Sequence, residues 1–334
     1  MKLKFKLLAA SALVALGLTA QAAPITIKFS HVVAKDTPKG LAAEYFAKKA
    51  EEYTKGQVQV EVYPNSTLYK DKEEMEALQM GAVQMLAPSL AKFGPLGVKE
   101  FEVFDLPFIF DNADELHKVT QGAVGKSLFA KLEPKGIMGL AYWDNGFKSL
   151  SANTPIKAPA DLKGKKLRIQ SSKVLEEQMR ALGALPQVMA FGEVYQALQT
   201  GVVDGTENPI SNLYTQKMHE VQKHLTLTEH GYLGYAVIVN KKFWNGLPAD
   251  IRASLDKAMD ESTKYANSIA QKQNDHDLQE VIKSGKTAVY KPSAAERMAF
   301  KKALVPVHKA MESRIGSEII QDVYKATGFD ASKL

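Results

Sequence analysis

The sequence predicts an α/β protein of two domains, with one long helix that reaches across both. Strand and helix patterns alternate along most of the chain, as in domains with a largely parallel sheet. About 310 residues remain after a predicted signal peptide at residues 1–22, and single cores rarely exceed ~250–300 residues. A helical pattern over residues 250–284 contains no glycine or proline. At ~1.5 Å per residue it would be about 50 Å long, more than the ~30 Å diameter of a small domain.

The N-terminus has the three parts of a secretory signal peptide. Lys2, Lys4 and Lys6 precede an apolar run over residues 7–20, and small residues follow up to Ala22. The run is shorter than the ~20 residues of a membrane-spanning helix. We therefore expect cleavage near Ala22 and export of the mature protein from the cytoplasm. The chain contains no cysteine, which excludes a lipid anchor at the cleavage site, thiolate zinc sites and cysteine nucleophiles.

The first predicted block is a β-α-β unit. Residues 57–63 alternate polar and apolar side chains, which is typical of a strand, and residues 25–29 form a second strand. Between them Thr37 can cap a helix whose apolar residues share one face. A helix over residues 72–80 and an apolar segment over residues 85–88 follow. This alternation predicts the α/β organisation of the first domain.

The second block begins after a predicted loop around Asn145-Gly146. Its elements are expected, in chain order, as a strand at 165–170, helices at 172–182 and 191–200, a short strand at 202–204, and a loop at 205–209. Loops at the ends of strands in such sheets are where ligands usually bind. The loop at 205–209 is therefore a candidate part of a binding site.

Each of the two predicted domains is built from two separate stretches of the chain. The first domain is expected to comprise residues 23–145 and 234–273, and the second residues 146–233 and 274–334. The helix at 250–284 would span both. A coiled coil is the alternative for this segment, but its apolar residues form no sustained heptad seam.

Composition and motifs argue against catalysis and against a nucleic-acid partner. The sequence has no P-loop, no G-x-S-x-G and no H-E-x-x-H motif. His219 and His224 lie five positions apart, about 140° around a helix, so they cannot share a metal from one face. The formal charge of +6 falls to +3 without the signal's lysines, which gives no reason to expect nucleic acid. We expect no cofactor. A hydrolase site assembled from distant residues stays open as an alternative.

Two cations are the best candidates for a binding site. Arg168 lies within the predicted strand at 165–170 between apolar neighbours, so we expect it to be at least half buried. A buried arginine needs an anionic partner, and its planar guanidinium suits a carboxylate. Lys148 could contact a second carboxylate. From the residues alone, a structural ion pair and a ligand site both remain open for Arg168.

The chain resembles the solute-binding proteins of tripartite ATP-independent periplasmic (TRAP) transporters, and their dicarboxylate-binding DctP branch most closely. The segments that carry the resemblance are residues 29–32 (FSHV), 101–110 (FEVFDLPFIF), 161–168 (DLKGKKLR) and 189–208 (MAFGEVYQALQTGVVDGTEN). It implies the periplasmic binding protein fold, with two α/β domains around a ligand cleft, crossing strands between them, and a long helix that bends on closure.

The resemblance also implies a function and a site. The function would be capture of a C4-dicarboxylate such as succinate, fumarate or malate by hinge closure, without catalysis, and delivery to the small and large membrane subunits of the transporter. A monomer is the default in the family. In relatives, the residues matching Arg168 and Asn208 contact a ligand carboxylate, and the position of Lys148 often holds an arginine. The full set of predicted ligand-binding residues is Arg168, Asn208, Lys148, Phe191, Ser89, His31 and Tyr235.

Alternatives remain for both the ligand and these side chains. Another organic acid, such as a sugar acid, an oxo acid or an aromatic acid, would also suit Arg168. A ligand-sensing role beside a membrane receptor would use the same cleft. Four of the side chains have structural alternatives: Phe191 as core, Ser89 as a turn hydroxyl, His31 as a strand-end cap, and Tyr235 as an ordinary strand residue.

Overall fold

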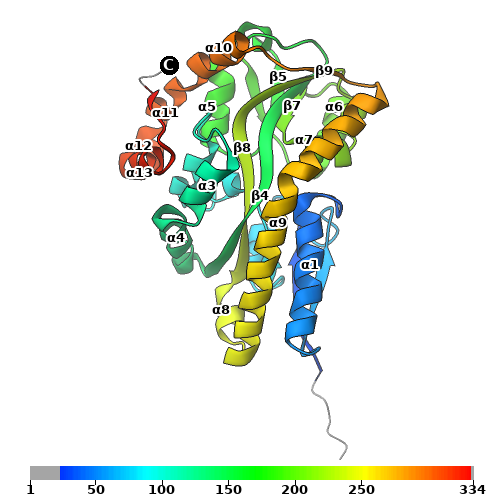
Figure 1. Cartoon of the computed structure of the whole chain (residues 1–334), viewed down its shortest axis with the longest axis vertical. Coiled ribbons are helices and arrows are strands. Elements are labelled where there is room, and N and C mark those ends of the chain that lie inside the picture. The colour runs from blue at the N-terminus through cyan, green and yellow to red at the C-terminus, as the bar shows by residue number, and fades with distance from the viewer. Residues whose placement is uncertain (1–22, 332–334) are drawn as a thin grey trace, which may run out of the picture.

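One sheet runs through the molecule. The computed structural model describes residues 23–331, and its sheet has nine strands in the order β2-β1-β3-β8-β4-β7-β5-β6, with β9 paired to β8 (Figure 1). The strands are β1 (Ile25–Ser30), β2 (Val58–Tyr63), β3 (Met85–Leu86), β4 (Ile137–Ala152), β5 (Lys166–Ile169), β6 (Leu185–Val188), β7 (Gly205–Asn208), β8 (His224–Asn240) and β9 (Ala288–Tyr290). The predicted signal peptide lies outside the described residues.

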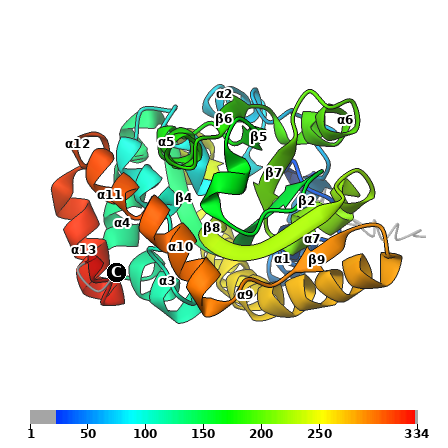
Figure 2. The same ribbon diagram turned by 90° about the horizontal axis from the view of Figure 1, so that it is seen from above.

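Helices pack around this sheet. The α-helices are α1 (Pro38–Tyr53), α2 (Glu74–Gln79), α3 (Ala113–Thr120), α4 (Ala123–Ala130), α5 (Lys173–Ala181), α6 (Val194–Gln199), α7 (Ile210–Thr215), α8 (Lys241–Asn245), α9 (Ala249–Ser284), α10 (Ala294–Leu304), α11 (Pro306–Ala310), α12 (Glu312–Ile315) and α13 (Ser317–Thr327). Short 3₁₀ turns join several of them. Seen from above, α11, α12 and α13 gather at the end of the molecule opposite α6, and α10 runs from them toward the middle (Figure 2).

The two ends of the sheet form two lobes. We call β1, β2 and β3 with α1 and α2 the first lobe, and β5, β6 and β7 with α5, α6 and α7 the second lobe. In the first lobe β1 pairs in parallel with β2 and β3, and in the second β5 pairs in parallel with β6 and β7. The long antiparallel pair of β4 and β8 connects the lobes. The predicted α/β architecture is confirmed.

Helix α9 extends along both lobes, as predicted. It contains 36 residues, about 54 Å at 1.5 Å per residue. It packs against α1 of the first lobe and α7 of the second, and Figure 1 shows it running diagonally across the front of the molecule. The predicted start of α1 is also confirmed, because the Thr37 side chain accepts a hydrogen bond from the Gly40 backbone N–H.

The predicted loop around Asn145-Gly146 is wrong, because this segment lies within β4. The pairing of β4 with β8 shifts register between Asp144 and Gly146, which marks a β-bulge or a similar irregularity. A bulge can accommodate residues that favour turns without ending the strand, and it changes the direction of the neighbouring side chains. Here the Asn145 side chain meets β8, because its Nδ2 donates to the Tyr235 hydroxyl at 2.6 Å.

The strand predicted at residues 202–204 is wrong as well. These residues form a turn after Gly201, whose φ of 73° is left-handed. The strand is β7, over the residues predicted to be a loop, and all four of its residues are buried. The helix predicted at 191–200 is shorter in its α-helical part, since residues 191–193 form a 3₁₀ turn before α6.

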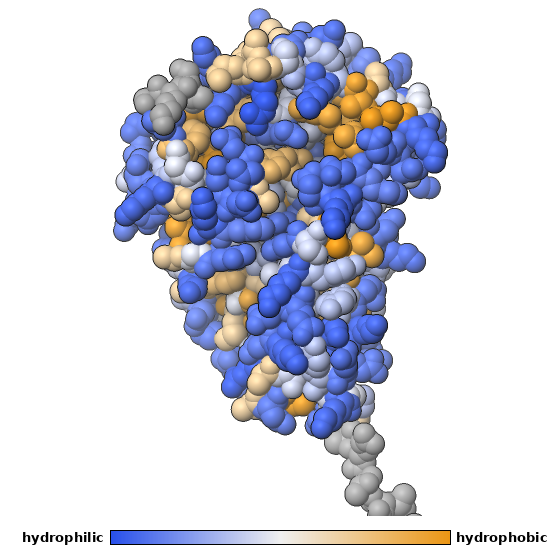
Figure 3. Space-filling view, in the orientation of Figure 1, coloured by the Kyte–Doolittle hydropathy of each residue, from blue (hydrophilic) through white to orange (hydrophobic). Residues whose placement is uncertain are grey.

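The surface of the molecule is largely hydrophilic. Figure 3 shows several small apolar areas on this face, the most extensive of them at the upper right. Ile282, near the C-terminal end of α9, is 49% exposed. Among residues 23–331, none of the helices combines the length and the apolar character needed to cross a membrane.

Candidate functional site

The predicted site residues are all buried near the middle of the molecule, and none is more than 6% exposed. They come from both lobes and from the connecting strands: His31 follows β1, Ser89 follows β3, Lys148 is in β4, Arg168 in β5, Phe191 after β6, Asn208 at the end of β7, and Tyr235 in β8. Several therefore lie at or just beyond the carboxyl ends of parallel strands, where α/β sheets bind ligands.

Arg168 is buried without a carboxylate partner. Its Nε and one terminal nitrogen both donate to the Met189 carbonyl, at 3.0 and 2.8 Å, and its guanidinium carbon lies 5.7 Å from the centroid of the Phe191 ring. Burial lowers the pKa of Arg168, although the charges of the Asp71 and Glu207 carboxylates act to raise it. The sequence left a structural ion pair and a ligand site open for Arg168. Among the described residues, Arg168 forms no ion pair.

Asn208 lies on the strand next to Arg168. Arg168 is in register with Thr206 of β7, and the Asn208 Nδ2 donates to the Thr206 hydroxyl at 3.2 Å. The Asn208 Oδ1 is buried and has no hydrogen-bond partner. An unpaired buried polar atom costs about 1–3 kcal/mol, so the protein alone does not satisfy the hydrogen-bonding capacity of the Asn208 amide.

Lys148 already has a carboxylate partner. Its Nζ lies 2.8 Å from a Glu207 oxygen, and the other oxygen of Glu207 lies 3.0 Å from His230 Nε2. Burial alone would raise the pKa of Glu207, but Lys148 and His230 together lower it to about 2. The Lys148 ammonium is therefore balanced within the protein. Its predicted contact with a second ligand carboxylate stays a prediction.

Ser89 contacts both Tyr235 of β8 and Gln170 of the second lobe. Ser89 and Tyr235 form an antiparallel β-bridge, and the Ser89 hydroxyl donates to Gln170 Oε1 at 2.6 Å, two residues beyond Arg168. Burial raises the pKa of Tyr235 to about 12, so its hydroxyl is neutral and accepts a hydrogen bond from Asn145. Ser89 thereby joins the first lobe to the second.

His31 is 1% exposed. Burial, followed by the nearby Lys39 ammonium, lowers its pKa to about 3, against a smaller opposing effect of the Val33 backbone. Neither ring nitrogen reaches a side-chain or backbone partner with full hydrogen-bond geometry. His31 is therefore a neutral imidazole whose two ring nitrogens can still form hydrogen bonds.

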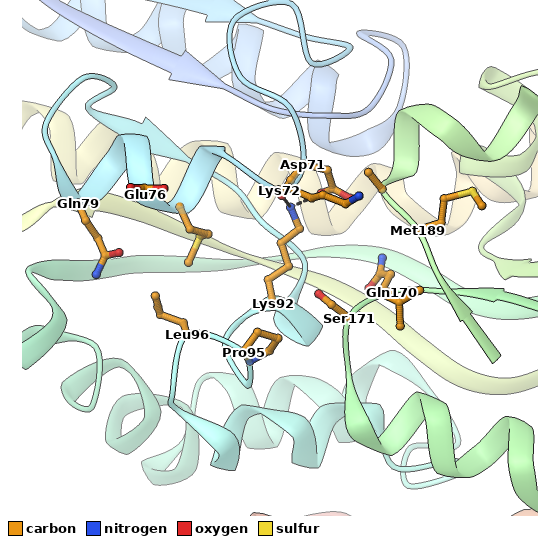
Figure 4. Close-up of a pocket in the computed structure, with 13 residues that line it drawn as sticks. Asp71, Lys72, Glu76, Gln79, Lys92, Pro95, Leu96, Gln170, Ser171 and Met189 are labelled. Atoms are coloured by element: carbon orange, nitrogen blue, oxygen red, sulfur yellow. Dashed lines mark hydrogen bonds and ion pairs between the residues drawn. The ribbon is translucent and has the colours of Figure 1, made fainter. Parts of the chain in front are cut away.

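A cavity of about 340 Å³ opens between the lobes beside these residues. It is lined on the first-lobe side by Lys92 and residues of α2, and on the other by Gln170 and Met189, the neighbours of Arg168 (Figure 4). None of the predicted site residues lines it. Two residues that line it are hydrogen-bonded to predicted site residues, Gln170 to Ser89 and Met189 to Arg168, so the cavity adjoins the predicted site.

Asp71 bridges the lobes at this cavity. Its Oδ2 accepts the Phe191 backbone N–H at 2.9 Å, and its carboxylate forms an ion pair with Lys92, which also pairs with Glu74 at 2.6 Å. Figure 4 shows Lys92 pointing at Asp71 across the cavity wall. Burial alone would raise the pKa of Asp71, but Lys92, the Phe191 backbone and Arg168 lower it. Both lobes therefore contact each other in this structure.

The sequence analysis missed Asp71, Lys92 and Lys39. Lys39 left a detectable signal, because it shares one face of α1 with Ala43, Phe46 and other buried residues. A lysine on the apolar face of a helix indicates a buried charge. Asp71 and Lys92 left none, since their pairing depends on contacts between separate segments.

Comparison with known proteins assigns the chain to a family. Residues 29–314 match the model of the DctP family, described as bacterial extracellular solute-binding protein, family 7. The chain belongs to this family. It is a family of solute-binding proteins, so the chain is a binding protein and not an enzyme.

Individual DctP-family relatives are similar over nearly their whole length. A C4-dicarboxylate-binding periplasmic protein DctP of Rhodobacter capsulatus is 67% identical over 313 residues, covering 94% of each chain. A TRAP periplasmic solute-binding protein of Sulfurospirillum deleyianum with bound succinate has a TM-score of 0.88 at 46% identity, covering 91% of this chain and 99% of that one. The corresponding Pseudomonas aeruginosa protein with bound L-malate has a TM-score of 0.84 at 44% identity, covering 86% and 100%.

Proposed function

We propose that this protein is the periplasmic C4-dicarboxylate-binding subunit of a TRAP transporter. The observation that carries the proposal is Arg168, a guanidinium that is 1% exposed and hydrogen-bonded only to the neutral Met189 carbonyl among residues 23–331. A buried cation without an anion is stabilised by one that arrives with the ligand. The relatives that bind succinate and malate support a C4-dicarboxylate as that anion.

In the proposed complex one carboxylate of the ligand pairs with the Arg168 guanidinium and accepts a hydrogen bond from Asn208 Nδ2. Phe191, whose ring packs near the guanidinium, covers the pair and excludes water. Removing water strengthens the ion pair, since the effective dielectric constant falls from ~80 toward ~20. His31, Ser89 and Tyr235 line the remaining wall, with Lys148 as a further cation.

Closure of the lobes completes the site. Contacts across the cleft, from Asp71 to Phe191 and from Ser89 to Gln170, hold the closed arrangement. The bulge of β4 at Asn145 and the span of α9 are the places where bending would occur. The membrane subunits then recognise the closed form of a monomeric binding protein, which reaches the periplasm by a signal peptide cleaved near Ala22.

Isothermal titration calorimetry of the ligand-stripped protein tests the proposal. Succinate, fumarate and malate are expected to bind one per chain, and butyrate and galactonate at least a hundredfold more weakly, because they leave a site group unpaired or do not fit. Tightest binding of a sugar acid or a monocarboxylate would refute the dicarboxylate assignment.

The transport role needs a separate measurement. Deleting the gene is expected to abolish uptake of radiolabelled succinate by cells at micromolar concentration, and the intact gene on a plasmid should restore it. Unchanged uptake in the deletion strain would contradict transport and favour a sensing role.

A further inference from the structure

The buried cations of the described residues differ in their partners. Lys39, Lys148 and Arg168 are the lysines and arginines of residues 23–331 that are almost completely buried. Lys148 has the Glu207 carboxylate. Neither Lys39 nor Arg168 forms an ion pair within the part of the chain that the structure describes. One of these unpaired cations belongs to each lobe.

Lys39 is held by neutral groups. Its Nζ donates to the Ala87 carbonyl at 2.8 Å and lies 3.7 Å from the centroid of the Tyr235 ring. An ammonium has three N–H donors, and a carbonyl with a ring face satisfies it incompletely. The Lys39 ammonium is therefore held in one orientation and can still donate a hydrogen bond to an anion.

Its place in the helix adds to the cost of the charge. Lys39 is the second residue of α1 after the Thr37 cap, where the positive end of the helix dipole disfavours a cation. A hydrophobic residue on this face would pack against Ala43 and Phe46 at no electrostatic cost. Stability of the lobe therefore gives no reason for a lysine at this position.

Burial lowers the pKa of Lys39 to about 7, with Glu74 and Asp71 raising it and Lys92 lowering it. The lysine is thus close to losing its charge in the surroundings that the protein alone supplies. A bound carboxylate would restore the charge, because an opposite charge beside an ammonium raises its pKa.

Lys39 belongs to the same site as Arg168. Tyr235, the ring beside its ammonium, is bridged to Ser89, which is hydrogen-bonded to Gln170 near Arg168. The Asp71 carboxylate raises the pKa of both Lys39 and Arg168. The two cations therefore face one region from opposite lobes.

We propose that Lys39 binds the second carboxylate of a dicarboxylate whose first carboxylate is at Arg168, and that it makes the site select diacids over monoacids. The inference rests on the proposed function and assigns the distal contact to Lys39, because the Lys148 ammonium is already neutralised by Glu207. A diacid then pairs both unpaired cations when the lobes close. A monoacid leaves Lys39 buried and unpaired.

Calorimetry with Lys39→Met tests the proposal, with succinate and butyrate as ligands. Succinate affinity is expected to fall at least about a hundredfold, as when one partner of a buried charge pair is truncated, while the weak butyrate affinity is unchanged or rises. Lys48→Met is the matched control, since it removes an exposed lysine from the same helix and should bind succinate as the wild type does. Lys148→Met is measured beside them.

Succinate affinity within threefold of wild type in Lys39→Met would overturn the proposal, as would equal losses for succinate and butyrate. A loss of diacid selectivity in Lys148→Met alone would assign the distal contact to Lys148. If the wild type binds no diacid, the proposed function fails and this inference fails with it. Those results are distinguishable, because the wild-type titration is read first.

Lys39→Arg keeps the cation and tests the site if Lys39→Met does not fold. Wild-type succinate affinity is expected to fall severalfold or more from pH 7 to pH 9 as the free Lys39 loses its proton, whereas Lys39→Arg stays constant. The other groups that act on Lys39 or adjoin it are Glu74, Asp71, Lys92, Tyr235 and His31, and the arginine variant retains them all. Equal pH profiles for the two proteins would refute the role of Lys39.

Discussion

Replacing Arg168 by methionine separates a ligand-binding arginine from a structural one. In the protein alone, the side chain's two hydrogen bonds to the Met189 carbonyl stabilise it by about 1.5–3 kcal/mol each, because they involve a charged donor. Against this stands the several kcal/mol that an unpaired ion loses on burial. The two nearly cancel, so Arg168→Met without ligand should lie within about 2 kcal/mol of wild type.

The response to ligand should change completely. Succinate at a hundredfold excess over its dissociation constant stabilises the wild type by about 2.7 kcal/mol, and the variant should gain almost nothing. Urea unfolding followed by circular dichroism measures the free energy of unfolding. Comparing samples without succinate and with about 10 mM succinate gives both the stability of the free protein and the stabilisation by the ligand. Arg180→Met, which removes an exposed arginine of α5, is the matched control and should resemble the wild type.

A structural arginine would give the opposite pattern. If Arg168→Met lost about 3–5 kcal/mol without ligand, as expected for a broken buried ion pair, and still gained stability from succinate, the reasoning about Arg168 would be refuted. A loss of both would mean that the hydrogen bonds to Met189 hold the second lobe together.

Three further predictions concern stability and the contact between the lobes. Glu207→Gln should cost about 3–5 kcal/mol at pH 7 by leaving Lys148 unpaired, and the added Lys148→Met should recover much of the loss in a double-mutant cycle. Because the Glu207 pKa falls to about 2 from 4.5, its contribution is present above pH 4.5 and lost as the pH falls toward 2, so urea midpoints of wild type and Glu207→Gln should converge there. Gly205→Ala should lower the calorimetric melting temperature by several degrees, since its Cβ would lie 2.2 Å from the Ser151 carbonyl oxygen, and an unchanged value would contradict this packing. Asp71→Asn should weaken the contact between the lobes at Phe191, so succinate should dissociate faster in stopped-flow measurements. An unchanged dissociation rate would argue against Asp71 as a contact of the closed form.

The sequence predicted the elements whose signals are local. The cap at Thr37, the alternation in β2 and the uninterrupted pattern of α9 depend on neighbouring residues, and each is confirmed. Arg168 was predicted to be buried because its strand neighbours are apolar, and it is 1% exposed.

The errors arose where distant residues decide the structure. Glu207 made β7 resemble a loop, since a charged residue in a buried strand is stable only with its partners Lys148 and His230 from β4 and β8. Asn145-Gly146 carries the composition of a turn, and only its pairing with β8 shows that the strand continues through it. The lack of an anion beside Lys39 could not be predicted either, because it is a property of the packed site.

The strand order also governs how this chain reaches its native state. β8 lies at the centre of the sheet and pairs with both β3 and β4. The first lobe is therefore complete only after Met85 of β3 has paired with Val239 of β8. Such pairings between distant parts of a sequence slow folding, because loop-closure entropy is lost before the contacts form. A nascent chain that ends before His224 already contains β4, the partner of β7, but lacks β8, the strand that pairs with β3 of the first lobe. The topology therefore delays completion of the first lobe until the last third of the chain is being synthesised.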